Sequence, residues 1–195
     1  MCEEMKTLVS RLAEYLRRSE QQLRCFHTYE SQVEGWFKGE LICFLGREKL
    51  EGRLPNFERE KKLYVGDERN RIQVDMILQF DPPGSVVWVE LKHWIKTQNN
   101  TNYYRNDWYF TTPSTNCSSC VQHGVEKLMK IDGEDGAKFM LVLCTDNPSS
   151  NVWNSGVKKF NTRFSPLSVH SLTNPDDYPD YFFLGLLHVA EGGQH

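Results

Sequence analysis

The stretch from Arg71 to Trp94 constrains the fold more than any other part of the chain. Two runs rich in Val, Ile, Leu, Phe and Trp flank residues 81–85, whose sequence DPPGS is a strong turn signal. Apolar runs around such a turn predict a β-hairpin, in which side chains alternate between the two faces of each strand. The sequence therefore predicts two adjacent strands at the centre of the fold.

Three ionisable residues lie inside these apolar strands. In the first strand Asp75 is expected on the face opposite to the apolar residues. In the second strand Glu90 and Lys92 are two residues apart and project from the same face, while Leu91 points the opposite way. Charged groups in such places are normally paired, bound to a metal ion or functional. The apolar residues of the first strand that we expect to share one face are Ile72, Val74, Met76, Leu78 and Phe80.

The pattern of Asp75 followed one strand later by Glu90-Leu91-Lys92 resembles the D…ExK signature of the PD-(D/E)XK nuclease superfamily. The proline of the superfamily's name is absent, since Val74 precedes Asp75, at a position that varies across the superfamily. The resemblance implies an α/β fold with a restriction-endonuclease-like αβββαβ core and a mixed central sheet flanked by helices.

The order of the expected elements agrees with this resemblance. Hydrophobic periodicity and turn signals predict helices over 29–46 and 117–131, and strands over 61–65 and 137–145 on either side of the hairpin. These elements form a core of about residues 29–145 within a single domain of 195 residues. The additions are an extra N-terminal helix within residues 1–28, spanning 3–24, and a C-terminal helix (151–164) and strand (181–189) within residues 146–195.

By the resemblance, Asp75 and Glu90 would ligate Mg2+, for which Mn2+ may substitute in relatives, and the Leu91 carbonyl would be a third protein ligand. Oxygen ligands suit this hard cation, which neutralises charge that develops on a phosphate. Lys92 would orient or deprotonate the attacking water, because the pKa of a lysine falls readily on burial or beside a cation. The expected function is therefore Mg2+-dependent hydrolysis of phosphodiester bonds, with DNA as the expected substrate.

The superfamily usually adds a glutamate from the first core helix, and two residues compete for that role. Glu34 lies three residues before Phe37 and seven before Leu41, and therefore shares their inward stripe. Glu40 lies at the edge of the same stripe. We favour Glu34 as the fourth catalytic residue and keep Glu40 as the alternative.

Cationic and aromatic side chains near the hairpin indicate where nucleic acid would bind. The insertion over 95–116 interleaves aromatic rings with cations, a pattern that suits stacking on bases and contact with phosphates. The competing interpretation is a loop whose aromatic residues pack on the domain. In relatives, the helix after the ExK motif often carries a Gln or Lys beside the substrate. The candidate substrate contacts are Lys61, Arg71, Lys96, Arg105, Trp108, Gln122 and Lys127.

Composition narrows the class of protein. With 39% hydrophobic and 25% charged residues, the chain is typical of a globular protein. Nothing approaches the run of about 18 apolar residues that a membrane span needs, so we expect no membrane partner. The N-terminal residues lack the apolar core of a signal peptide and are too acidic for a transit peptide, so we expect a cytoplasmic location. The net charge of −3 gives no general attraction to nucleic acid, so binding would depend on a local basic groove.

Two other functions stay open. The same fold without catalysis would serve binding or assembly, although all three signature residues are intact. A small zinc-dependent interaction module would use Cys117, Cys120 and His123, although no second CxxC is present and a helix would place the three on different arcs. A homodimer is a further expectation from the resemblance, since many relatives cut two strands as dimers.

Overall fold

The computed structural model describes residues 2–29, 33–64, 71–81, 85–94, 121–131, 136–145, 164–173 and 182–189. Its helices are α1 (Cys2–Arg17), α2 (Glu20–Thr28), α3 (Glu34–Leu50) and α5 (Val121–Met129). Its strands are β1 (Asn56–Tyr64), β2 (Arg71–Phe80), β3 (Ser85–Trp94), β4 (Ala137–Cys144), β5 (Phe164–Ser171) and β6 (Phe183–Val189).

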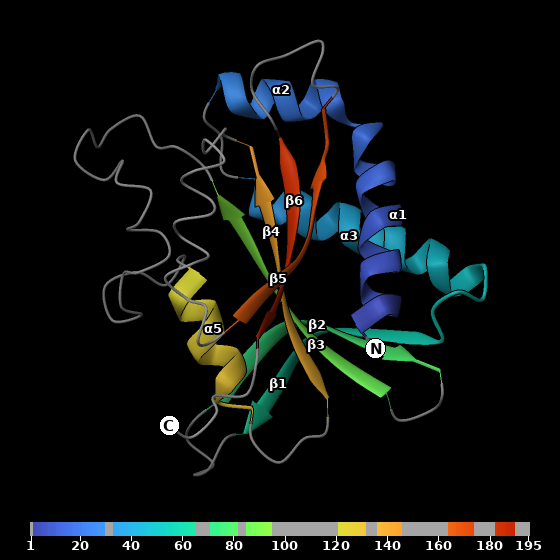
Figure 1. Cartoon of the computed structure of the whole chain (residues 1–195), viewed down its shortest axis with the longest axis vertical. Coiled ribbons are helices and arrows are strands. Elements are labelled where there is room, and N and C mark those ends of the chain that lie inside the picture. The colour runs from blue at the N-terminus through green and yellow to red at the C-terminus, as the bar shows by residue number, and fades with distance from the viewer. Residues whose placement is uncertain are drawn as a thin grey trace.

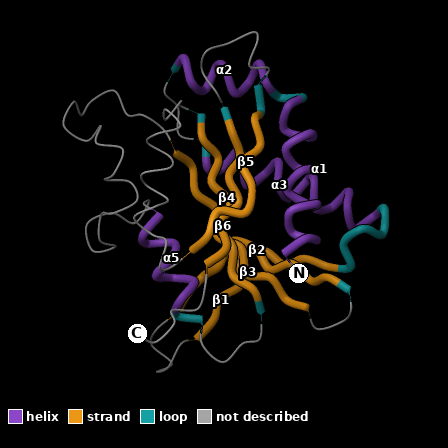
Figure 2. The backbone as a smooth tube through the Cα atoms, viewed as in Figure 1, coloured by secondary structure: helices purple, strands orange, loops and turns teal. Residues whose placement is uncertain are grey.

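The strands form one six-stranded mixed sheet in the order β1-β2-β3-β4-β6-β5 (Figures 1 and 2). The first three strands are antiparallel neighbours, and β3 and β4 are parallel. Parallel neighbours require a crossover connection, and α5 lies in the chain between these two strands. Strands β6 and β5 extend the sheet antiparallel to β4. The structure thus confirms the expected α/β class with a mixed central sheet.

Helices α1 and α3 cover one face of the sheet, and α5 covers the other (Figure 1). The burial of apolar side chains on both faces provides most of the driving force for folding. On the first face, residues of α1 and α3 pack on sheet residues that include Leu78, Val89, Leu91 and Leu141. On the second face, Val121, Val125 and Leu128 of α5 pack with sheet residues that include Trp88, Met140 and Val142.

The N-terminal segment is two helices and not the single helix that we expected. The chain leaves helical geometry at Ser19, and the N–H groups of Arg18 and Ser19 bond to carbonyls only three residues back. α1 buries its apolar stripe on the sheet, while α2 lies across one end of the molecule (Figure 1). No helix in the described part of the chain is long and apolar enough to cross a membrane.

Other boundaries also differ from the predictions. Gly46 does not end α3, which continues to Leu50, and the left-handed backbone follows at Gly52 with a φ of 71°. β1 begins at Asn56, five residues earlier than expected. β5 was not expected, since the sequence analysis placed no strand over 164–171. The structure places β5 at the sheet edge, where its Pro166 is tolerated. Of the helix expected over 151–164, residues 151–163 lie outside the described residues.

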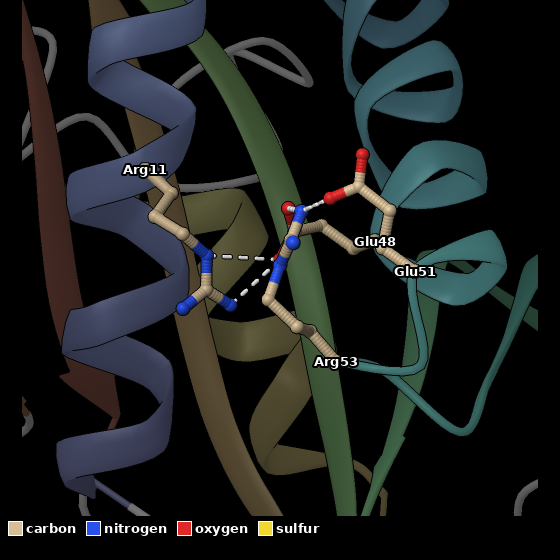
Figure 3. A network of polar contacts seen from close by, with 4 residues as sticks. All are labelled: Arg11, Glu48, Glu51 and Arg53. Carbon is tan, nitrogen blue, oxygen red and sulfur yellow. Dashed lines mark hydrogen bonds and ion pairs between the residues drawn. The ribbon is translucent and has the colours of Figure 1, made fainter.

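A buried glutamate joins α1 to the end of α3 (Figure 3). The Glu48 side chain is only 2% exposed and accepts hydrogen bonds from Arg11 of α1 at 2.9 Å and from Arg53 at 2.5 and 3.0 Å. Arg53 also pairs with Glu51. Burial raises and the two guanidinium groups lower the pKa of Glu48, and the net pKa lies below its ordinary value. This network fixes how α1 and α3 pack together.

We expect Glu48→Gln to lower the free energy of unfolding by about 2 kcal/mol, because a neutral amide cannot replace two charge-assisted contacts in a buried position. Urea denaturation measures the change. The control is Glu14→Gln, which removes the same charge from an exposed position on α1 and is expected to change stability by less than about 0.5 kcal/mol. Equal effects of the two substitutions would contradict a structural role for the Glu48 network.

Candidate functional site

The ladder between β2 and β3 ends beside the signature residues. It runs from Phe80–Ser85 to Met76–Val89, and the next positions in the same register are Asp75 and Glu90. There the Asp75 carboxylate takes over a backbone role, since its Oδ2 accepts the Leu91 N–H at 3.0 Å. The two carboxylate-bearing residues therefore lie just beyond the last pair of the ladder, where the strands part.

β2 changes faces at this point, so our expectation that its five apolar residues share one face was wrong. Ile72 and Val74 belong to the cluster beneath α5, whereas Met76, Leu78 and Phe80 belong to the cluster beneath α1 and α3.

The neighbouring strand β1 is irregular at the same level. Glu60 has a left-handed φ of 53°, and the β1–β2 ladder lacks the pair Glu60–Asp75 between Arg59–Met76 and Lys61–Val74. A left-handed conformation at a residue other than glycine is uncommon and strained, and such residues cluster at functional sites. Asp75 is thus unpaired in both ladders, and the two oxygens of its carboxylate accept hydrogen bonds from the Leu91 N–H and from Lys38.

Glu90 and Lys92 project from one face of β3, as expected, beneath α5. Glu90 is 1% exposed, and its Oε1 lies 3.3 Å from the Lys92 Nζ and 2.5 Å from the Lys127 Nζ of α5. Its Oε2 is buried and has no hydrogen-bond partner among the described residues. A buried carboxylate oxygen without a donor is costly, so this oxygen is the candidate ligand for a cation.

The surroundings shift the pKa values of the two carboxylates in opposite directions. Burial and then the negative charge of Asp75 raise the pKa of Glu90 to about 7, against the opposing charges of Lys127 and Lys92. Burial also raises the pKa of Asp75, but the Lys38 ammonium and the Leu91 N–H outweigh it and hold that pKa below its ordinary value. Groups of unlike pKa placed side by side are typical of sites that bind metal or transfer protons.

Gly124 allows α5 to lie directly on this site. A Cβ atom there would be 2.9 Å from the Met140 Cε and 3.2 Å from both the Glu90 Cγ and the Lys92 Cε. The first distance requires the Met140 side chain to move, and the other two are tighter than most contacts of real Cβ atoms. The helix thus covers the Glu90–Lys92 pair because this position has no side chain.

From α3 the residue that reaches the site is Lys38, which our sequence analysis missed. Its Nζ lies 2.9 Å from the Asp75 Oδ1 and 2.9 Å from the Glu60 Oε1. Burial lowers the pKa of Lys38, but the two carboxylates raise it more, so its net pKa is above the ordinary value. The signal in the sequence was its spacing, since Lys38 lies one helical turn after Glu34.

The structure brings neither expected helix glutamate into these contacts. Glu34 begins α3 and is exposed, and not inward-facing as we expected. The Glu40 carboxylate accepts a hydrogen bond from the Tyr15 hydroxyl at 2.8 Å, between α1 and α3. The physical reason is helix phase, because α3 turns Phe37 and Leu41 to the sheet and Lys38 to the site.

His93 anchors the N-terminal end of α3. It lies on the face of β3 opposite to Lys92, where its Nδ1 accepts the Val33 N–H at 3.3 Å and its Nε2 bonds to the Thr145 hydroxyl at 2.7 Å. Burial lowers the pKa of His93 to about 4, which keeps the ring neutral and able to accept a hydrogen bond.

Few of the expected substrate contacts lie among the described side chains. Lys127 lies on Glu90, and Lys61 is exposed on β1 with Glu58 at 3.4 Å. His123 lies on α5, and its buried Nδ1 has no hydrogen-bond partner among the described residues. Outside the described residues lie Lys96, Arg105, Trp108, Cys117 and Cys120, and also the side chains of Arg71 and Gln122.

The donor set fits a hard divalent cation with few protein ligands. In the described part of the chain, no group of three or more His, Cys, Asp or Glu side chains is placed to hold a metal. Two carboxylates remain, those of Asp75 and Glu90, and the Glu90 Oε2 has no hydrogen-bond partner in the described part of the chain. Mg2+ is usually bound through one or two carboxylates and keeps several waters, so this set suits it.

Comparison of the chain with protein-family models, with curated proteins and with solved structures finds no match.

Two glycine substitutions test the close approach of α5. Gly124→Ala is expected to lower the free energy of unfolding by about 1 kcal/mol, because crowding outweighs the gain in helix propensity. The control, Gly39→Ala in α3, meets nothing within 4 Å and is expected to stabilise by about 0.5–1 kcal/mol. Chemical denaturation measures both, and equal stabilisation would mean that α5 does not lie this close to Glu90.

The raised pKa of Glu90 predicts how stability depends on pH without divalent cations. The native state holds the Glu90 proton up to about pH 7 and the unfolded state only to about 4.5, so this group's contribution is full below 4.5 and is lost as pH rises through 7. Glu90→Gln removes the titration. Relative to the unaltered protein, the variant should gain roughly 3 kcal/mol between pH 4.5 and 8. Parallel stability profiles of the two proteins would contradict the shift.

Proposed function

We propose that this chain is a Mg2+-dependent nuclease of the PD-(D/E)XK type that hydrolyses phosphodiester bonds, with DNA as its substrate. The observation that carries the proposal is the buried Glu90 carboxylate, which lies close enough to Asp75 for that charge to raise its pKa and has Lys92 at 3.3 Å. Its Oε2 has no hydrogen-bond partner among the described residues. Buried ion pairs often contribute little to stability compared with apolar residues of similar volume, so a functional role for these groups is favoured.

In this proposal Asp75 and Glu90 hold the ion together with the Leu91 carbonyl. When bound, the metal supplies charge neutralisation at the phosphate and lowers the pKa of a bound water. Lys92 is 5% exposed and held beside Glu90, so its ammonium is positioned to orient the attacking water and to stabilise the negative charge of the phosphate. Lys127 is placed on the same carboxylate and is available to contact the phosphate.

The arrangement of elements is compatible with the proposal. The order α3, β1, β2, β3, α5, β4 is the αβββαβ order of the restriction-endonuclease-like core, with a helix on each face of the sheet. The signature residues lie where two adjacent strands part, at a position open to contacts from both helices. Fold analogy by itself does not establish an activity, so the argument still depends on the site.

A second candidate is the same fold without catalysis, used for binding or assembly. The observation that favours it is the pairing of both carboxylates with lysines, Asp75 with Lys38 and Glu90 with Lys127. Such pairing compensates the negative charge that would otherwise attract a cation.

Cleavage of supercoiled plasmid with Mg2+, and of single-stranded RNA in parallel, tests the proposal. Asp75→Asn and Lys92→Met are each expected to lower the cleavage rate at least about 100-fold, because each removes a group that acts on the reacting atoms. Chelation of the metal should abolish cleavage. The control Glu14→Gln removes a charge from an exposed position on α1 and should keep the full rate.

Three results are informative. Cleavage that persists in both variants would contradict the assignment of Asp75 and Lys92 to the catalytic site. Cleavage of RNA alone would keep the chemistry and change the substrate. Absence of cleavage of either nucleic acid, with Mg2+ or Mn2+, would favour the binding or assembly function.

A further inference from the structure

The ammonium of Lys38 occupies one of the oxygens that a metal ion would need. Asp75 has two carboxylate oxygens: Oδ2 accepts the Leu91 N–H at 3.0 Å, and Oδ1 lies 2.9 Å from the Lys38 Nζ. Both carboxylate oxygens of Asp75 therefore accept a hydrogen bond. The Glu90 Oε2, in contrast, has no hydrogen-bond partner among the described residues. The two carboxylates of the site are unequal in their readiness for a cation.

Glu60 gives the same ammonium a second partner. Its Oε1 also lies 2.9 Å from the Lys38 Nζ, and its side chain is 49% exposed against 16% for Asp75. Lys38 is thus shared between a shielded carboxylate and a more exposed one. A lysine that left Asp75 would keep an ion pair and gain contact with water, so its departure would not leave a buried charge alone.

The backbone holds Glu60 in the place that makes this sharing possible. Glu60 has a φ of 53° and lies where the β1–β2 ladder lacks the pair with Asp75. Strain at a residue other than glycine persists only where the surroundings enforce it. Regular pairing would join the two residues through their backbones, whereas here they are joined through Lys38.

We propose that Lys38 is an internal cation that competes with the divalent metal for Asp75, and that metal binding moves its ammonium from Asp75 to Glu60. This inference rests on the proposed function, because it assumes that Asp75 is a metal ligand. Without metal, the Lys38 ammonium neutralises Asp75. With metal bound, the divalent ion takes the place of the ammonium at Asp75. The affinity of the site for the metal then depends on how much more strongly Asp75 binds the divalent ion than the Lys38 ammonium.

Calorimetric titration with Mn2+ tests the competition through two variants with opposite expected effects. Lys38→Met keeps the length of the side chain without its charge and should tighten Mn2+ binding by about tenfold. Glu60→Gln removes the second partner, should leave Lys38 on Asp75, and should weaken binding by about threefold or more. The controls make the same changes nearby: Lys49→Met on α3, which bonds to Asn56, and Glu58→Gln on β1, which pairs with Lys61. Both controls should stay within about twofold of the unaltered protein.

A crystal structure of the unaltered protein with Mn2+, located by its anomalous scattering, tests the displacement itself. We expect the ion at the Asp75 Oδ1 and the Lys38 Nζ on Glu60 alone. An ion bound at Asp75 with Lys38 still paired to it would overturn the proposal, since the effect of Lys38→Met would then be one of charge only. This measurement needs no variant, so it decides the matter even where Lys38→Met does not fold.

The outcomes separate this inference from the proposed function. If the unaltered protein binds Mn2+ and Lys38→Met binds it equally well, the competition is absent and the nuclease proposal stands. If neither protein binds Mn2+ at millimolar concentration, both proposals fail. If Lys38→Met binds Mn2+ and the unaltered protein does not, Lys38 is a competitor strong enough to keep the metal out.

Discussion

The hydrogen bond from the Leu91 N–H to the Asp75 carboxylate is the constraint on which the site depends. It replaces a backbone contact at the point where β2 and β3 part, and so allows the ladder to end without leaving this donor unpaired. Because the strands part there, β2 can change faces, and the charge of Asp75 acts on the buried carboxylate of Glu90. The same parting gives α5 and α3 access to the two carboxylates from opposite faces of the sheet.

Sequence reasoning succeeded where the structure is local and periodic. Glu90 and Lys92 share a face because the period of a strand is two residues, and the apolar runs around a Pro-Gly turn specify the hairpin. It failed where geometry is set by packing between distant segments. The change of face at Asp75 depends on the gap in two ladders, and the contact of Lys38 depends on the phase of α3 on the sheet. The stop expected at Gly46 failed because tertiary packing overrides local propensity.

The charged residues of the site partly neutralise one another. Three ammonium groups meet two buried or half-buried carboxylates and the more exposed Glu60. Even so, the pKa of Glu90 stays raised to about 7, because its burial and the charge of Asp75 are not fully offset. The folded protein therefore carries an electrostatic cost at neutral pH that an apolar residue would not have. Sites that act on charged ligands commonly carry such a cost, since the same arrangement gives the ligand its binding energy.

The anchoring of α3 decides how an exchange of cations at Asp75 would proceed. At its first turn the Val33 N–H is bound by His93 of β3, and near its last turn Glu48 is bound by two arginines, one of them on α1. The interval from Val33 to Glu48 spans four turns of helix, so a shift of α3 along its axis would break both anchors together. The helix is in this sense a fixed support, and Lys38 projects from its middle. Movement of the ammonium between Asp75 and Glu60 then requires only rotation about side-chain bonds, which is fast and leaves the packing of the sheet unchanged.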